Sequence, residues 1–296
     1  MNITVIYILL VVFGLLIGMF TAYLFGKFPE SWLQDYDYDP KAPDFRLSKR
    51  MKYFPHGLIA GVCCSVTYFL SVSKINEITN TADIKWIHLS IIILVVPVFI
   101  LTMFADKLNR IIPDQFSVYV AVIGLLSIAA DFIEGSYWIS PEASWYVFVL
   151  NHVLGAVIGG GVLLLINFIC ETFFGTVGMG MGDVKLLGAT GFLVGGYGLY
   201  FTFLIAIFVG AIYSIPLIIR KYIRIAKENK EIKNSKNPSK TRREIQMRKN
   251  SIHYADDPDY LAFGPFIALG GAAFLALEPF LLIRFIGIFE SFNLIF

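Results

Sequence analysis

Residues 86–105 read WIHLSIIILVVPVFILTMFA, an almost uninterrupted apolar run. About 20 mostly apolar residues are enough for a helix to cross the ~30 Å hydrocarbon core of a bilayer. Runs of the same kind recur along the chain, at roughly 3–25, 54–72, 116–133, 146–170, 184–196, 199–219 and 259–278. Because backbone polar groups cannot stay unpaired in lipid, these runs are expected to be helices. The sequence therefore predicts an all-α, polytopic membrane bundle of about eight transmembrane helices.

The composition supports this fold class. Of the 296 residues, 57% are hydrophobic and only 16% are charged, and the mean hydropathy is +0.70. A soluble domain of this size would need more polar surface. The first run is long and lacks a small-residue cleavage site, so we expect a retained helix rather than a signal peptide. The sixth run is short and rich in glycine, and the tail 279–296 could form a ninth helix, either partial or interfacial.

Lysine and arginine are concentrated in alternate loops, which predicts the orientation of the chain. Six lie in 26–53 and twelve lie in 220–249, whereas 134–145 contains none. This pattern fits eight spans in the cell (inner) membrane, with the N-terminus outside. The cytoplasmic loops would then be 26–53, 106–115, 171–185 and 220–258.

We expect one membrane domain, 1–296, with cytoplasmic insertions at about 26–53 and 220–258. The first insertion mixes charges with prolines and aromatic residues, so it is expected to be ordered against the membrane surface. The second is rich in Lys, Asn and Ser without apolar periodicity, so we expect a flexible segment that lies on anionic lipid. Nucleic acid is not an expected partner, because no aromatic residues interleave these charges.

The three cysteines predict neither a zinc site nor a disulfide framework. Cys63 and Cys64 are adjacent in one helix, where neighbouring side chains point about 100° apart, and Cys170 ends the fifth run. No C-x-x-C pair is present. We interpret all three as small apolar residues in helix packing.

Two stretches place an aspartate at the end of a span: FADKLNRIIPDQF at 104–116 and GMGMGDVKLLG at 178–188. A single aspartate at a helix end is usually a boundary residue. Here, however, Asp106 and Asp183 fall on the same predicted side of the membrane, and a lysine follows each of them. Their combination favours a functional site.

The glycines before Asp183 have two interpretations. Gly180 and Gly182, with Gly178 upstream, lack Cβ atoms and so allow close approach of another backbone. A peptidase holds its substrate extended by backbone pairing, and a glycine strip beside a carboxylate would permit that. Tight packing between helices explains the same spacing equally well.

These stretches resemble the two catalytic motifs of type IV prepilin peptidases. The second motif is G-x-G-D followed by x-K-L, which is here the run 180–186. The first is an aspartate followed seven residues later by Pro and then Asp or Asn, and it is matched by Asp106, Pro113 and Asp114. GLLIGMF at 14–20 and FGPFIALGG at 263–271 also agree with the family.

The resemblance implies an aspartic endopeptidase that cleaves the basic leader of prepilins or pseudopilins at the cytoplasmic membrane face, as in pilus assembly or protein secretion. Many members also N-methylate the new N-terminus with S-adenosylmethionine. Larger members carry paired C-x-x-C motifs in the first cytoplasmic loop, and their absence here means that zinc is not expected. Presenilin-like enzymes share G-x-G-D but pair it with a Tyr-Asp motif that this sequence lacks.

The residue roles also follow from the resemblance. Two carboxylates close together share one proton, so one can accept a proton from water while the other donates to the scissile carbonyl, without a metal. The catalytic pair would be Asp106 and Asp183. Support and substrate approach would come from Gly180, Gly182, Lys185, Pro113, Asp114, Gly264 and Pro265.

Two other protein classes fit the sequence less well than a peptidase. A transporter or channel would place paired carboxylates near mid-bilayer within an inverted repeat, and neither is evident in the sequence. A lipid-phosphate transferase that binds Mg²⁺ would need denser aspartate clusters, for which DYDYD at 35–39 and ADDPD at 255–259 are the candidates.

Overall fold

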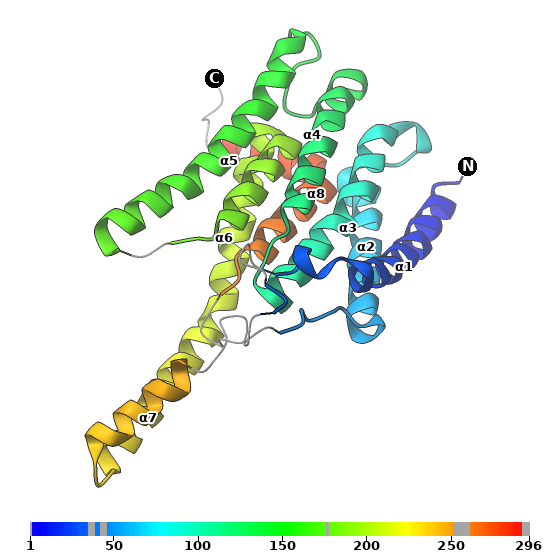
Figure 1. Cartoon of the computed structure of the whole chain (residues 1–296). Helices are drawn as coiled ribbons and strands as arrows, with labels where there is room; N and C mark the ends of the chain where they lie inside the picture. Colours follow the sequence, from blue (N-terminus) through cyan, green and yellow to red (C-terminus); the bar gives the residue numbers. More distant parts are fainter. Residues whose placement is uncertain (1, 35–38, 42–45, 176–177, 251–260, 292–296) are drawn as a thin grey trace.

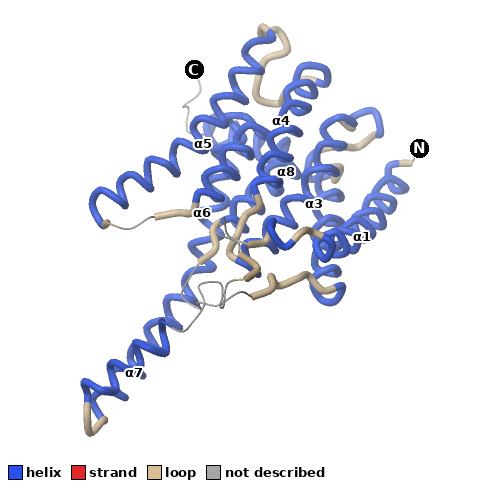
Figure 2. Tube along the Cα trace, viewed as in Figure 1, coloured by secondary structure: helices blue, strands red, loops and turns tan. Residues whose placement is uncertain are grey.

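The computed structural model describes residues 2–34, 39–41, 46–175, 178–250 and 261–291. All regular elements in these residues are helical (Figure 1, Figure 2). The long helices are α1 Ile3–Lys27, α2 Leu58–Ser71, α3 Trp86–Asn109, α4 Asp114–Glu134, α5 Trp145–Phe174, α6 Met181–Asn234, α7 Pro238–Asn250 and α8 Gly264–Ser291. Short helical turns are η1 Glu30–Trp32, η2 Tyr53–Gly57, η3 Lys74–Asn76 and η4 Thr81–Asp83. Seven helices are long and apolar enough to cross a membrane, so the predicted polytopic bundle is confirmed.

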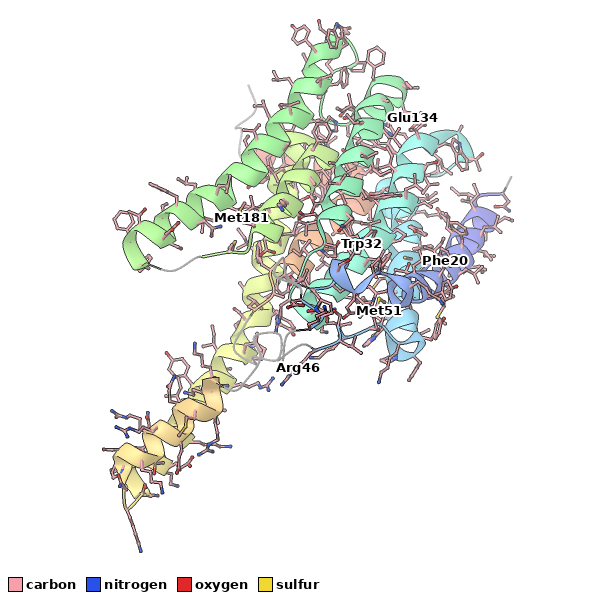
Figure 3. The ribbon with its side chains drawn as sticks, in the orientation of Figure 1. Phe20, Trp32, Arg46, Met51, Glu134 and Met181 are labelled. Carbon is pink, nitrogen blue, oxygen red and sulfur yellow. The ribbon has the colours of Figure 1, made fainter. Side chains whose placement is uncertain are left out.

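The helical bundle has two ends, the aspartate end and the far end. The aspartate end contains Asp106, near the end of α3, and Asp183, near the start of α6. The far end contains Glu134, the last residue of α4. Figure 3 shows Glu134 at the far end and Arg46, from the first insertion, at the aspartate end.

Glycines bring α1 and α2 into backbone contact. A Cβ on Gly18 would lie 2.0 Å from the backbone nitrogen of Gly61, and one on Gly14 would lie 2.5 Å from that of Ser65. Real Cβ atoms do not approach other atoms this closely, so side chains at these positions would push the helices apart. The stretch 14–20, which resembles the family, therefore serves helix packing.

The α6 element reverses direction at Gly195. This residue has φ 71° and ψ 176°, a conformation that only glycine adopts readily. Neighbouring positions on α8 contact residues on opposite sides of the reversal. A Cβ on Gly271 would lie 2.9 Å from Cγ2 of Thr190, and one on Gly270 would lie 2.3 Å from the carbonyl oxygen of Thr202. In a straight helix, Thr190 and Thr202 would be about 18 Å apart, so the chain must turn back between them.

The reversal accounts for the sixth and seventh predicted spans. Runs 184–196 and 199–219 are the two antiparallel legs of α6, which passes from the aspartate end to the far end and back. The backbone N–H of Gly196 donates to Oδ1 of Asn151 over 3.0 Å, which holds the turn against α5. The seven long apolar helices therefore account for the predicted eight membrane crossings, because α6 forms two of them.

The tail does not form a separate ninth helix, as one interpretation of 279–296 suggested. Instead, α8 continues through Pro279 to Ser291. A proline interrupts helix hydrogen bonding because it has no N–H. Asn76 compensates, since its Nδ2 donates to the carbonyl oxygen of Ala276 over 2.8 Å and its Oδ1 accepts from the N–H of Phe280 over 3.2 Å.

The first insertion is ordered in its described part, as predicted. The side chain of Glu30 accepts hydrogen bonds from Ser48 and Gln34 and pairs with Arg50. Burial alone would raise the pKa of the Glu30 carboxyl, but the hydrogen bonds from these residues outweigh it and lower the pKa to about 2.

The second insertion differs from the expected flexible segment. Over its described part, α6 extends out of the bundle to Asn234 and α7 returns beside it (Figure 1). Arg248 pairs with Glu231 at 3.0 Å and Lys249 with Glu228 at 2.7 Å. The segment is rich in Lys, Arg and Glu, which are good helix formers, so two charged helices can form without an apolar face.

Ionisable side chains form a buried network at the far end. Nδ1 of His88 lies 2.8 Å from Oε2 of Glu134, and its Nε2 lies 3.1 Å from Oδ1 of Asp131. The other oxygen of Asp131 lies 3.2 Å from Nε2 of His152, whose Nδ1 contacts the carbonyl oxygen of Phe192 at 2.6 Å. The network thus links α3, α4, α5 and the first leg of α6.

We expect Asp131→Leu to destabilise the bundle by about 3 kcal/mol or more, because it leaves the half-buried His88 and the buried His152 without their shared partner. Asp131 is only 8% exposed and His152 only 1%. The measurement is unfolding in mixed micelles, with Glu142→Gln in an exposed loop at the same end as the matched control. Equal stability of the two variants would show that the network does not hold the helices together.

Candidate active site

Asp106 lies in the last turn of α3 and is 6% exposed. The helix ends at Arg110, which adopts a left-handed conformation with φ 61° and donates its N–H to the carbonyl oxygen of Asp106 over 2.8 Å. This end is also anchored to the first insertion, because Asn109 accepts from the N–H of Lys49 over 2.8 Å and donates to its carbonyl over 3.1 Å.

Asp183 is the third residue of α6 and is 9% exposed. Gly180 is the N-cap residue, and its carbonyl oxygen accepts the N–H of Asp183 over 3.1 Å. A Cβ on Gly180 would lie 3.6 Å from Oδ2 of Asp183, so the carboxylate lies beside the cap residue. The G-x-G-D motif is therefore a helix start that places one carboxylate beside its N-cap.

Gly264, the first residue of α8, lies against Asp106. A Cβ at this position would lie 2.6 Å from Oδ2 of Asp106 and 2.7 Å from Cδ1 of Ile112, so no other residue fits without displacement. A Cβ on Gly182, the residue before Asp183, would also meet Ile112, 3.0 Å from its Cβ. The structure thus places the two predicted catalytic residues on either side of Ile112, together with one predicted supporting residue.

The pair retains an unused acceptor. Oδ1 of Asp183 is buried and has no hydrogen-bond partner among the described residues. Buried polar atoms without partners are uncommon, and an acid–base site is one place where they occur. Two buried carboxylates close to each other ionise together only at a high free-energy cost, so this arrangement suits transfer of a single proton.

Asp114 lies apart from this pair. It begins α4 after Pro113 and accepts from Nζ of Lys185 through both oxygens at 2.8 Å. Both side chains are about 40% exposed, at 43% for Asp114 and 39% for Lys185, so the ion pair contributes little stability by itself. Its effect is to tie the start of α4 to the start of α6.

The three glycines of GMGMGD have different neighbours. A Cβ on Gly178 would lie 2.8 Å from Sγ of Cys170, and one on Gly182 would lie 3.0 Å from Cβ of Ile112. Gly178 and Gly182 therefore pack against other parts of the chain, which leaves no space there for a substrate backbone. A Cβ on Gly180 would meet only Asp183 Oδ2, at 3.6 Å, so substrate approach stays a prediction for this glycine.

Pro265 lies in a groove of about 680 Å³ bounded by α2, α3, α8 and the second leg of α6. Its walls are mostly apolar and include Phe104 and Tyr213, and Lys107 and Arg220 also line it. The groove borders the aspartate pair, because Pro265 follows Gly264 directly. An apolar segment of a substrate could lie here.

The sequence interpretation missed the far-end network and the asparagine contacts. Asp131 and His152 are ionisable residues inside apolar runs, and that signal could have identified the network. Within the described residues, no three His, Cys, Asp or Glu side chains are arranged to hold a metal ion. Residues 255–259, and all but Asp39 of the cluster 35–39, lie outside the described residues.

The model of the type IV leader peptidase family matches residues 93–215. This segment contains Asp106, Asp114 and Asp183 and ends before Gly264. Neither the comparison with curated proteins nor that with solved structures found a match. Over residues 93–215, the predicted resemblance to leader peptidases is therefore confirmed, and this segment lies in a chain whose described residues form seven helices long and apolar enough to cross a membrane.

Proposed function

We propose that the protein is an aspartic endopeptidase that removes the basic leader of prepilin-like or pseudopilin-like proteins. The observation that carries this proposal is that two buried carboxylates, Asp106 and Asp183, converge at Ile112. A Cβ on Gly264, 2.6 Å from Oδ2 of Asp106, and a Cβ on Gly182, the neighbour of Asp183, would both contact this side chain. The family match adds support for leader peptidase chemistry.

In the proposed reaction, the ionised carboxylate accepts a proton from water as the water oxygen attacks the scissile carbonyl carbon. The protonated carboxylate donates its proton to the carbonyl oxygen. When the tetrahedral intermediate collapses, the C–N bond breaks and the leaving amine takes up the proton that the first carboxylate accepted from water. The second carboxylate recovers its proton from a hydroxyl group of the intermediate as the new carboxyl group forms. Neither a covalent intermediate nor a metal is required, and S-adenosylmethionine would serve only a separate methylation of the new N-terminus.

The proposal places the aspartate end at the cytoplasmic face and the N-terminus outside. The cations of the two insertions support this orientation, since both insertions leave the bundle at the aspartate end (Figure 1). A substrate whose apolar stem lies in the bilayer would then present its scissile bond at the depth of Asp106 and Asp183.

A purified-protein assay tests the function. The protein is incubated with a peptide that joins a basic leader to an apolar segment, with and without EDTA. We expect cleavage at the junction under both conditions. A transporter would give no cleavage, and a Mg²⁺-dependent transferase would neither cut the peptide nor retain its own activity in EDTA. Comparing inverted with right-side-out vesicles tests the orientation, since only the inverted ones should cut added peptide.

A further inference from the structure

Asn167 of α5 makes a two-bond contact with the chain that leads into the G-x-G-D motif. Its Oδ1 accepts from the N–H of Met179 over 2.6 Å, and its Nδ2 donates to the carbonyl oxygen of Met179 over 3.0 Å. One side-chain amide thus satisfies both backbone groups of one residue, as a neighbouring β-strand would. Such a contact fixes both the position and the rotation of the Met179 peptide units.

This contact lies one residue before the N-cap of α6. Met179 precedes Gly180, whose carbonyl oxygen accepts the N–H of Asp183 over 3.1 Å. Gly178 packs closely against α5, because a Cβ there would lie 3.3 Å from Oδ1 of Asn167 and 2.8 Å from Sγ of Cys170. The position of Gly180, and with it that of the Asp183 backbone, therefore depends on where Asn167 holds the preceding residue.

The two halves of α5 are held differently. The first half contacts the first leg of α6 closely: a Cβ on Gly155 would lie 2.2 Å from the carbonyl oxygen of Gly191. The second half diverges from α6 (Figure 1). Its aromatic side chains are exposed, with Phe168 65% exposed and Phe173 75% exposed. Asn167 belongs to this second half and joins it to the motif.

We propose that Asn167 is a positioning residue for the peptidase reaction, acting on Asp183 through Met179 and Gly180. This inference rests on the proposed function. Loss of the contact would let the start of α6 shift and turn the Asp183 carboxylate away from its partner. Misplacement of a reacting group by about 1 Å can reduce a rate by about 100-fold, even when binding is unchanged.

The first test is Asn167→Leu, which removes both hydrogen bonds at similar volume. We expect kcat to fall about 10- to 100-fold with KM unchanged. The matched control is Asn151→Leu, which removes the bond from the Gly196 N–H at the far end of the same helix. It should keep kcat while losing a comparable amount of stability. Equal kcat in Asn167→Leu and wild type, or equal kcat losses in the two variants, would overturn the positioning role.

The second test uses protonation to restore the contact. In Asn167→Asp, the protonated side chain can again accept from the Met179 N–H and donate to its carbonyl, whereas the ionised form would repel that carbonyl. The ratio of the variant's kcat to that of wild type should therefore rise as the pH falls. Cys170 and Asp183 lie nearby in both proteins, so the ratio isolates the substituted group. A ratio that is independent of pH contradicts the two-bond contact.

Hydrogen exchange separates this inference from the proposed function. The amides of Met179, Gly180 and Asp183 should exchange faster in Asn167→Leu than in wild type, whether or not any peptide is cut. Unchanged exchange would overturn the contact itself. If wild type cuts no leader peptide, the proposed function fails, and the positioning role fails with it even where the exchange result holds.

Discussion

Asp106→Asn and Asp183→Asn are each expected to reduce leader cleavage by at least about 1,000-fold. Each half of the acid–base exchange needs its own carboxylate, and an amide can neither accept the proton from water nor release one to the carbonyl oxygen. The pair acts as a unit, so the double variant should lose no more activity than either single variant. The measurement is the initial rate of cleavage of a leader peptide by purified protein.

Asp114→Asn is the matched control for these variants. Asp114 is the next aspartate along the first motif, but its carboxylate pairs with Lys185 at 2.8 Å. It should keep part of the activity, because its exposed ion pair orients helix starts and takes no part in proton transfer. All three variants should reach the membrane in normal amounts. Cleavage near the wild-type rate in either Asp106→Asn or Asp183→Asn would rule out the catalytic pair.

Gly155→Leu is expected to destabilise the bundle by about 3 kcal/mol or more, so that little folded protein is recovered. The backbones of α5 and the first leg of α6 are in close contact here, because a Cβ on either Gly155 or Gly191 would lie 2.2 Å from the other's carbonyl oxygen. Backbone atoms cannot move aside as a side chain can, so α5 would have to separate from the first leg of α6. That leg begins with the residues that hold Asp183.

Gly161→Leu is the matched control, since a Cβ at Gly161 meets nothing within 4 Å. It lies on the same helix and adds the same apolar volume toward lipid. The readouts are the yield of monodisperse protein in detergent and its unfolding midpoint. Comparable yield and midpoint for the two leucine variants would mean that the close approach of α5 and α6 is not required for folding.

The sequence alone determined the class of fold and the identity of the catalytic candidates. Apolar runs such as 86–105 are long enough that no soluble arrangement could bury them, so helices in a membrane follow directly from their length. The motif spacing identified Asp106 and Asp183, because a helix end and a helix start are encoded by residues close to each aspartate in sequence. Local chemistry of this kind requires no tertiary information.

The expectation for 220–250 was wrong because the absence of an apolar face does not prevent helix formation. Pairs such as Arg248–Glu231 stabilise two charged helices against each other, and these partners are 17 positions apart. Likewise, the tail 279–291 continues α8 because Asn76, some 200 positions away, satisfies the backbone groups around Pro279. Neither arrangement can be inferred from periodicity within a segment.

Only the tertiary structure decided how the site is assembled. Gly264 packs against Asp106 and Ile112, the turn at Gly195 returns α6 along α8, and Asn167 holds Met179. Each depends on the rotation and depth of one helix relative to another. Apolar runs in lipid fix that a helix crosses the membrane, but they leave its rotation undetermined, since the hydrocarbon surrounds every face equally. Glycine contacts and side-chain bonds to distant backbone groups set the rotation, and these form only once the helices have packed.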